Sequence, residues 1–233
     1  MTAGAGYTRP VPVRARVPRP TAHRLSLYLR EVERLAAAGR ATVSSRELGV
    51  AAGAAEAQVR KDLGVIGRTG QPGVGYVVEA LGASIRSIIG VHRNWRAALV
   101  GAGNVGRALA AYRSFREEGF EIAAVLDADP SMLGRKVSGM EVQAMESLPE
   151  CVRRLGIDIG IIAVPPDAAQ QVADRLVAAG VKGILNFAPR RLRVPDRVPT
   201  VDVDFRSALE RLVLEVSQRG EDAPSRGRRG RPE

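Results

Sequence analysis

The chain contains little cysteine and no long apolar run, and these two shortages exclude several classes of protein. Its 233 residues include a single cysteine, Cys151, which excludes an internal disulfide framework and a cysteine-rich metal site. No run approaches the length that crosses a membrane, and no apolar segment follows the basic N-terminal residues as in a secretion signal. We therefore expect a cytoplasmic protein that does not associate with membranes.

Acidic residues are scarce in the first third of the chain. Residues 1–96 contain 15 basic and 6 acidic residues, a net charge of +9, whereas residues 97–216 contain 15 basic and 16 acidic residues. A positive field confined to one region favours a polyanionic partner, most simply nucleic acid. The alternative is a solvated basic surface that serves only solubility.

The stretch from Trp95 to Asp127 carries the clearest chemical pattern. An apolar run enters Gly101, and Gly103 and Gly106 follow in the spacing G-x-G-x-x-G. The spacing predicts a buried strand that turns sharply into a helix whose first N–H groups can hold a pyrophosphate. The glycines alone are weak evidence, because such turns also occur in proteins that bind no nucleotide.

A carboxylate strengthens the prediction of a dinucleotide site. A second apolar strand ends in Asp127, about 20 residues after the last glycine, where it can accept hydrogen bonds from both ribose hydroxyls of adenosine. A 2′-phosphate would meet a negative charge at this position. We therefore predict NADH and NAD+ as ligands rather than their 2′-phosphorylated forms.

An NAD-dependent dehydrogenase or reductase is the rival interpretation of this pattern. Hydride transfer to a carbonyl needs a positioned acid or base, yet the only two histidines, His23 and His92, lie in predicted helices away from strand ends. No Tyr-x-x-x-Lys sequence occurs. We therefore predict that the protein is not an enzyme. A third class, an interaction protein with a nucleotide-binding fold, would leave the basic first third unexplained.

The pattern of the basic first third predicts an N-terminal arm followed by a small helical domain. Residues 1–20 are rich in proline and arginine and are predicted to be disordered. Residues 21–80 predict three helices, the first with Thr21 as its N-cap and the second opened by the capping box of Ser44 and Glu47. In the third helix, Gln58, Arg60 and Lys61 fall off the apolar stripe and are predicted to face solvent or a ligand.

A glycine-rich turn and a short strand follow the third helix. Three helices before such a turn predict a winged-helix domain, whose third helix enters the major groove of DNA while the wing touches the backbone. The alternative is a small helical subdomain with a solvated basic helix. The uneven charge favours the interpretation as a DNA-binding domain.

The remaining segments predict a second, α/β domain. Residues 81–94 are interpreted as a helix that joins the domains, and residues 95–203 as strands alternating with helices in a doubly wound parallel sheet, with an irregular segment up to Val142. Residues 204–218 predict an apolar-striped helix, which could pack on its own domain or exchange onto a partner subunit. Residues 219–233 are predicted to form a disordered basic tail.

Several motifs taken together resemble the Rex family of redox-sensing transcriptional repressors. They run in family order over roughly residues 21–217: Gln58–Leu63, Gly73–Tyr76, Gly101–Gly106, Asp127–Pro130, Gly183–Pro189 and Val203–Phe205. The resemblance implies an N-terminal winged-helix domain, a Rossmann-type NAD(H)-binding domain and an exchanged C-terminal helix. It further implies a homodimer that binds inverted-repeat operators in double-stranded DNA and is released when NADH, in competition with NAD+, binds the Rossmann domain.

The resemblance also implies roles for individual residues. The dinucleotide site would comprise Gly101, Gly103, Asn104, Val105, Gly106 and Asp127 for the adenosine and pyrophosphate, with Val164, Pro165, Asn186, Phe187, Ala188 and Pro189 around the nicotinamide. DNA would contact Ser44, Ser45, Gln58, Arg60, Lys61, Gly73, Gly75 and Tyr76. The switch between states would use Arg30, Tyr112, Asp204 and Phe205, although Asp204 could simply be the N-cap of the last helix.

The chain departs from the family pattern near the expected DNA-binding surface. Gly64-Val65-Ile66 stands where the family usually has an aromatic pair before a glycine, and Gln71-Pro72 where the wing often carries a basic residue. Ala54 and Ala55 offer no side-chain cap to the third helix. We therefore expect an operator affinity or sequence that differs from the family norm.

Overall fold

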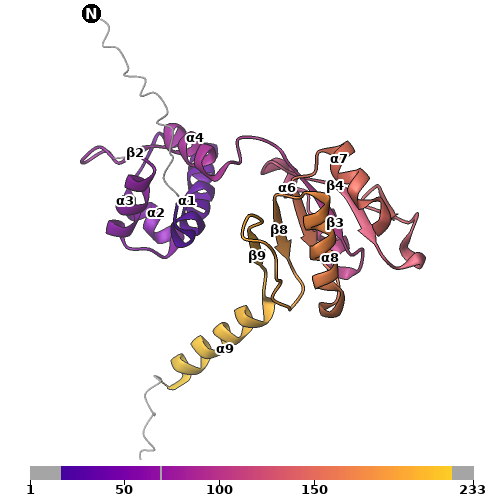
Figure 1. Ribbon diagram of the computed structural model, residues 1–233. Helices are drawn as coiled ribbons and strands as arrows, with labels where there is room; N and C mark the ends of the chain where they lie inside the picture. Colours follow the sequence, from indigo (N-terminus) through magenta and orange to yellow (C-terminus); the bar gives the residue numbers. More distant parts are fainter. Residues whose placement is uncertain (1–16, 69, 222–233) are drawn as a thin grey trace, which may run out of the picture. The chain divides into compact units, whose positions relative to one another are not determined.

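The computed structural model describes residues 17–68 and 70–221, which divide into two compact units between Asn94 and Trp95 (Figure 1). Most of the predicted basic arm and most of the predicted tail lie outside the described residues. The described ends of these segments are helical, because one helix already begins at Arg19 and another continues to Glu221. Within the described ranges, no helix combines the length and the apolar character needed to cross a bilayer.

The first unit is a winged helix, as predicted. Its two short strands pair antiparallel, Thr42 with Val77 and Val43 with Tyr76, and Gln71 bridges to Gly75 to form the wing. The elements follow in the order α1 (Arg19–Ala37), β1 (Thr42–Val43), α2 (Ser45–Ala52), α3 (Glu56–Val65), β2 (Tyr76–Val77) and α4 (Val78–Ile89).

The apolar stripe of α1 is buried where the sequence places it, but the helix begins earlier than predicted. Pro18 is the N-cap residue and Pro20 lies in the first turn, a position where a missing N–H costs no helical hydrogen bond. The predicted cap, Thr21, is buried and donates its hydroxyl to Asp62 at 3.1 Å. The cap prediction was wrong because a distant carboxylate, not the helix end, binds this hydroxyl.

The helix predicted to join the two domains is part of the first unit. It spans Val78–Ile89, and its buried side chains, Val78, Leu81 and Ile85, belong to the same core as those of α1. A Cβ at Gly82 would lie 3.1 Å from Cγ1 of Val32, so α1 and α4 approach closely at this glycine. The joining prediction failed because the apolar stripe of α4 packs against α1.

The second unit is a seven-stranded sheet with the Rossmann strand order. Starting from the strand before the glycine turn, the six parallel strands are β3 (Trp95–Val100), β4 (Phe120–Asp127), β6 (Met140–Ala144), β7 (Ile159–Ile162), β8 (Gly183–Asn186) and β9 (Thr200–Asp202). Their order across the sheet is β6-β4-β3-β7-β8-β9, that is 3-2-1-4-5-6, with β5 (Lys136–Val137) antiparallel at one edge. The order reverses between β3 and β7, where such sheets bind dinucleotides.

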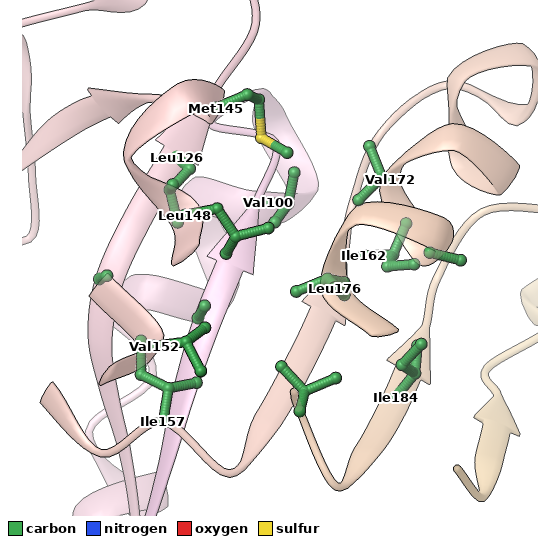
Figure 2. Close-up of a cluster of buried hydrophobic side chains, with 14 of the residues drawn as sticks. Val100, Leu126, Met145, Leu148, Val152, Ile157, Ile162, Val172, Leu176 and Ile184 are labelled. Atoms are coloured by element: carbon green, nitrogen blue, oxygen red, sulfur yellow. The ribbon is translucent and has the colours of Figure 1, made fainter. Parts of the chain in front are cut away.

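Successive residues of β3 point to opposite faces of the sheet, as the two-residue period of a strand requires. Ala98 and Val100 pack with α7 (Leu148–Leu155) and α8 (Pro166–Ala179), and Figure 2 shows Leu148, Val152, Val172 and Leu176 over the strands. Ala97 and Leu99 face the other side, which α5 (Asn104–Ala111) and the short α6 (Ser114–Glu117) cover in part. The strands buried on both faces explain the continuous apolar runs of the sequence.

The segment predicted to be irregular contains regular elements. β6 adds a parallel strand beside β4, with Val125 opposite Val142, and two 3-10 turns, η1 (Pro130–Met132) and η2 (Met145–Ser147), flank the β5–β6 pair. Only Val142 of β6 is fully buried, so the strand has no apolar run to mark it in the sequence. α7, which follows directly, was also missed.

The last helix, α9 (Phe205–Glu221), begins where the sequence predicts. The Asp204 carboxylate accepts hydrogen bonds from the backbone N–H groups of Arg206 and Ser207, at 2.9 and 3.1 Å, as an N-cap residue does. The helix presents apolar side chains to solvent, with more than half of each exposed: Leu209, Leu212, Val213, Leu214 and Val216.

Candidate dinucleotide and nucleic-acid sites

The glycine turn after β3 is shaped by close backbone contacts. Gly101 has a φ of 102°, and a Cβ there would strike the carbonyl oxygen of Ala163 at the end of β7. A Cβ at Gly106 would strike the carbonyl oxygen of Gly101, so α5 can start only if this residue has no side chain. These two glycines let the turn from β3 into α5 pack against the end of β7, at the point where the strand order reverses.

The middle glycine faces open space instead. No atom lies within 4 Å of the position that a Cβ at Gly103 would occupy, and Gly103, Asn104 and Val105 are exposed at the start of α5. Gly103 thus leaves free the space through which a pyrophosphate can approach the N–H groups of the helix. Arg107, one turn along, donates to Oδ1 of Asn104 at 2.6 Å and places a guanidinium at the same helix end.

Asp127 is held against the glycine turn. Its Oδ2 accepts the N–H of Ala102 at 2.7 Å, and its Oδ1 accepts the N–H of Asp129 at 2.9 Å. Each oxygen keeps lone pairs for further donors, such as a pair of ribose hydroxyls. These residues fit the adenosine half of a dinucleotide: a carboxylate fixed beside an open, glycine-lined helix N-terminus.

The carboxyl ends of β7 and β8 form the other half of this edge. Val164 and Pro165 follow β7 and lead directly into α8. Phe187, Ala188 and Pro189 follow β8, and Phe187 packs against Phe205 at the start of α9, with ring centroids 6.2 Å apart. The structure therefore brings the predicted nicotinamide residues to one edge of the sheet.

Asn186 has an internal role at this edge. It is fully buried, and its amide donates to the backbone oxygen of Arg190 at 2.9 Å and to Asp202 at 2.7 Å, while its oxygen accepts the N–H of Ala188 at 3.0 Å. All these bonds hold the loop after β8. The side chain therefore shapes the loop and does not reach the surface, so a contact of Asn186 with a ligand, which stays a prediction, would go through its backbone.

The predicted DNA-binding residues lie along α2, α3 and the wing. Arg60 and Lys61 are exposed, and Nη1 of Arg60 lies 3.2 Å from Oγ of Ser45 and from Oε2 of Glu56. Ser44 forms the predicted capping box, accepting the N–H of Glu47 while Glu47 accepts the N–H of Ser44. Ser45 and Arg60 thus share one surface, whereas the side chain of Ser44 is occupied by the helix cap.

A buried carboxylate connects α3 to α1. Asp62 is 1% exposed and accepts hydrogen bonds from Thr21, Tyr28 and both donor nitrogens of Arg24, the shortest at 2.6 Å, and from Gln58 at 2.9 Å. Burial alone would raise the pKa of Asp62, but the hydrogen bonds, led by Arg24, hold it at about 2. Gln58, predicted to face a ligand, is fixed by this carboxylate.

The wing presents glycines and an exposed valine. Gly73 and Gly75 flank Val74, which is about half exposed at the tip of the hairpin. Tyr76, predicted to contact DNA, is 7% exposed and packs in the core of the first unit. Burial raises the pKa of its hydroxyl. The ring supports the wing from inside the domain, and a contact of Tyr76 with DNA stays a prediction.

The four predicted switch residues are distributed over both units. Arg30 is exposed on α1 in the first unit, and Tyr112 is exposed at the end of α5 in the second, where its ring meets Phe115 edge to face. Asp204 and Phe205 open α9. A hydrogen bond from the Ser207 hydroxyl, at 2.5 Å, lowers the pKa of the Asp204 carboxyl, so its capping role is explicit in the structure.

An apolar groove crosses the face of the sheet that α5 and α6 leave partly open. It has a volume of about 350 Å³ and is lined by Phe115, Phe120, Ile159, Ile161, Leu185 and Val201, among others. Among the described residues, no group of histidine, cysteine or acidic side chains could hold a metal ion. Cys151 is buried and donates to Gln143.

Two long-range contacts of these regions have little or no signal in the sequence. Asp62 carries a weak signal, since it lies three residues after Val59 and beside Leu63, on the buried stripe of the helix. Arg190, beyond the predicted nicotinamide residues, donates from Nη1 to the carbonyl oxygen of Pro166 at 3.2 Å. No local sequence pattern predicts this contact, because Arg190 and Pro166 are 24 residues apart in the chain.

Two family models match the chain, one in each unit. The model described as "Putative DNA-binding protein N-terminus" matches residues 16–64, and the model of the CoA binding domain matches residues 92–190. The first contains α1, α2 and α3, and the second contains the glycine turn and Asp127.

Many curated relatives are similar over most of the chain. A redox-sensing transcriptional repressor Rex from Carboxydothermus hydrogenoformans is 48% identical over 86% of this chain and 97% of its own length. Its counterpart from Streptomyces coelicolor is 45% identical over 97% of this chain and 88% of its own. These relatives are named as repressors and not as enzymes.

Solved structures agree with the observed fold. The Rex-family repressor RSP, in complex with β-NAD+ and operator DNA, is 36% identical, covers 89% of this chain and 96% of its own, and superposes with a TM-score of 0.82. The structure of RSP in complex with β-NADH is 35% identical over 89% of this chain and 98% of its own, with a TM-score of 0.80.

Proposed function

Because this chain belongs to the Rex family of redox-sensing transcriptional repressors, we propose that it represses transcription according to the ratio of NADH to NAD+. Its winged helix binds inverted-repeat operators in double-stranded DNA. Binding of NADH to the Rossmann unit releases the repressor from its operator, and NAD+ competes with NADH for the same site. A repressor acts where the chromosome is, so we place it in the cytoplasm.

One observation carries the ligand assignment. Asp127 is fixed by the N–H of Ala102 directly beside the open face of Gly103. A carboxylate at this point accepts ribose hydroxyls and repels a 2′-phosphate, which supports the unphosphorylated dinucleotides. The nicotinamide then lies towards Val164, Pro165 and the loop after β8, since a dinucleotide spans the reversal point of the sheet.

The first unit supports the DNA assignment. Arg60 and Lys61 are exposed on α3, the helix that enters the major groove in winged-helix domains. Arg60 stands beside Ser45 at the start of α2, so guanidinium and hydroxyl can contact the same stretch of backbone or base edges.

We further propose a homodimer formed by exchange of α9. The helix exposes a stripe of leucine and valine side chains, and the apolar groove over β7, β8 and β9 is open to solvent beside α6. An apolar stripe and an apolar groove of the same chain support a contact between two copies. Light scattering of the full chain tests whether it is a dimer, and loss of the dimer in Leu212→Asp would assign the contact to α9.

The switch follows from the same dimer. We propose that Asp204 pairs with Arg30 in one state and with Tyr112 of the other subunit in the second state, while it keeps its capping role. A ligand shifts such an equilibrium only through a difference in its contacts to the two states. Phe205 could transmit a difference between the bound ligands to α9, because it packs on Phe187 at the proposed nicotinamide edge.

A mobility-shift assay on the promoter region of the protein's own gene neighbourhood tests the function. NADH and NAD+ are titrated separately into the complex of protein and DNA. We expect NADH to release the DNA and NAD+ to oppose that release. A complex that forms but is insensitive to NADH, or that responds equally to both nucleotides, would contradict redox sensing.

A further inference from the structure

The loop after β8 carries an arginine whose side chain is held at the nicotinamide edge. Nη1 of Arg190 donates to the carbonyl oxygen of Pro166, the first residue of α8, at 3.2 Å. Its backbone is fixed as well, because Asn186 donates to the oxygen of Arg190 and the N–H of Arg190 donates to Ala188. Arg190 thus links the two segments that follow β7 and β8.

No carboxylate of the described residues pairs with the guanidinium of Arg190 at this edge. Its side-chain hydrogen bond goes to the neutral carbonyl oxygen of Pro166. It also lies at the N-terminus of α8, a helix of 14 residues whose dipole adds positive potential there. Two sources of positive potential therefore coincide beside Val164 and Pro165.

The two forms of the ligand differ in charge at this end only. The nicotinamide ring of NAD+ carries a positive charge, and the dihydronicotinamide ring of NADH is neutral, whereas the adenosine and the two phosphates are the same in both. A cation near the ring therefore raises the free energy of bound NAD+ and leaves that of bound NADH nearly unchanged. A cation near the phosphates would favour both forms equally.

We propose that Arg190 is a specificity-determining residue that biases the site towards the reduced dinucleotide. This inference rests on the proposed NAD(H) site and adds a residue to it. The other arginines of the same loop are less suited to the role. Both Arg190 and Arg193 are exposed, but Arg193 is anchored to Gln170, in the second turn of α8, only through its backbone, whereas the side chain of Arg190 is itself held by Pro166.

A charge series at position 190 tests the proposal by calorimetry of the full-length protein with NADH and with NAD+. Two like charges a few ångströms apart at a hydrated edge alter binding by a factor of about three to ten. Arg190→Gln should tighten NAD+ binding by about that factor and change NADH binding less than about twofold. Arg190→Lys should lie near the wild type, and Arg190→Glu should tighten NAD+ further. Arg193→Gln is the matched control and should leave both affinities unchanged.

The salt dependence gives a second measurement. At about 1 M salt the Debye length falls to about 3 Å, so the difference between wild type and Arg190→Gln should shrink. An unchanged ratio of the two affinities in Arg190→Gln would overturn the inference, and so would equal weakening of both ligands, which would indicate a phosphate contact or a loop anchor. If the wild type binds neither nucleotide, the proposed function itself fails, which is a different outcome.

Discussion

The buried ion pair between α1 and α3 gives the sharpest test of how the DNA-binding unit is held together. Asp62 accepts five hydrogen bonds from four residues, and its partner Arg24 retains 22% of its side-chain exposure. We predict that Asp62→Asn destabilises this unit by about 3 kcal/mol. This value is the lower end of the cost of breaking a buried pair, since Arg24 can regain some water.

The dependence on pH follows from the shifted pKa. The pKa of Asp62 falls from its usual 3.8 to about 2, which is worth about 2 kcal/mol of unfolding free energy at neutral pH. Because the folded value is the lower one, this stabilisation is complete above the unfolded value and is lost as the pH falls from about 4 to about 2. Asp62→Asn should remove that acid-dependent part.

Hydrogen exchange of the amides in α1 and α3 is the appropriate assay, because it reports on the first unit independently of the second. The matched control is Glu33→Gln, which removes an exposed ion pair with Arg86 between α1 and α4 and should cost no more than about 1 kcal/mol. Equal protection of α3 in Asp62→Asn and wild type, within about 0.5 kcal/mol, would refute the assigned role of the pair.

Three further predictions concern the proposed sites. Asp127→Ala should weaken NADH binding in calorimetry and reduce the difference in affinity between NADH and NADPH. Equal affinity of the wild type for NADH and NADPH would contradict the assignment. Arg60→Ala should weaken specific operator binding in a mobility-shift assay by about 1 to 3 kcal/mol per half-site while NADH still binds. Operator affinity equal to that of the wild type would show that Arg60 does not read the DNA. Tyr112→Phe should bind NADH almost normally but need more of it to leave DNA, and an unchanged relation between occupancy and release would remove Tyr112 from the switch.

The features that the sequence predicted best are local ones. The stripe of α1, the capping box at Ser44 and the turn from β3 into α5 are each encoded within a few consecutive residues, so spacing alone identifies them. The same holds for the start of α9 at Asp204, where side chain and capped N–H groups are neighbours in the chain.

The features that the sequence did not predict depend on contacts between distant segments. β6 is a strand because β4 supplies its hydrogen-bond partners, and its own residues show little apolar pattern. Thr21 lost its predicted capping role to Asp62, 41 residues away. Tyr76 and Asn186 were placed in the correct segments, but only the tertiary structure reveals that both side chains point inward.

Discrimination between the two redox states must arise at one end of the dinucleotide site. In the proposed site, Gly103 and Asp127 lie beside the adenosine and pyrophosphate, which NADH and NAD+ share. These residues would therefore supply affinity but no redox sensitivity, because a ligand that binds two states equally shifts neither. In the proposed site, the loop after β8 would meet the ring that differs between the two ligands. The same loop contacts α9 through the rings of Phe187 and Phe205. If α9 is exchanged as proposed, the segment that distinguishes the ligands also contacts the helix that must move. Substitutions in this loop should then alter sensing, whereas substitutions at the glycine turn should alter affinity alone.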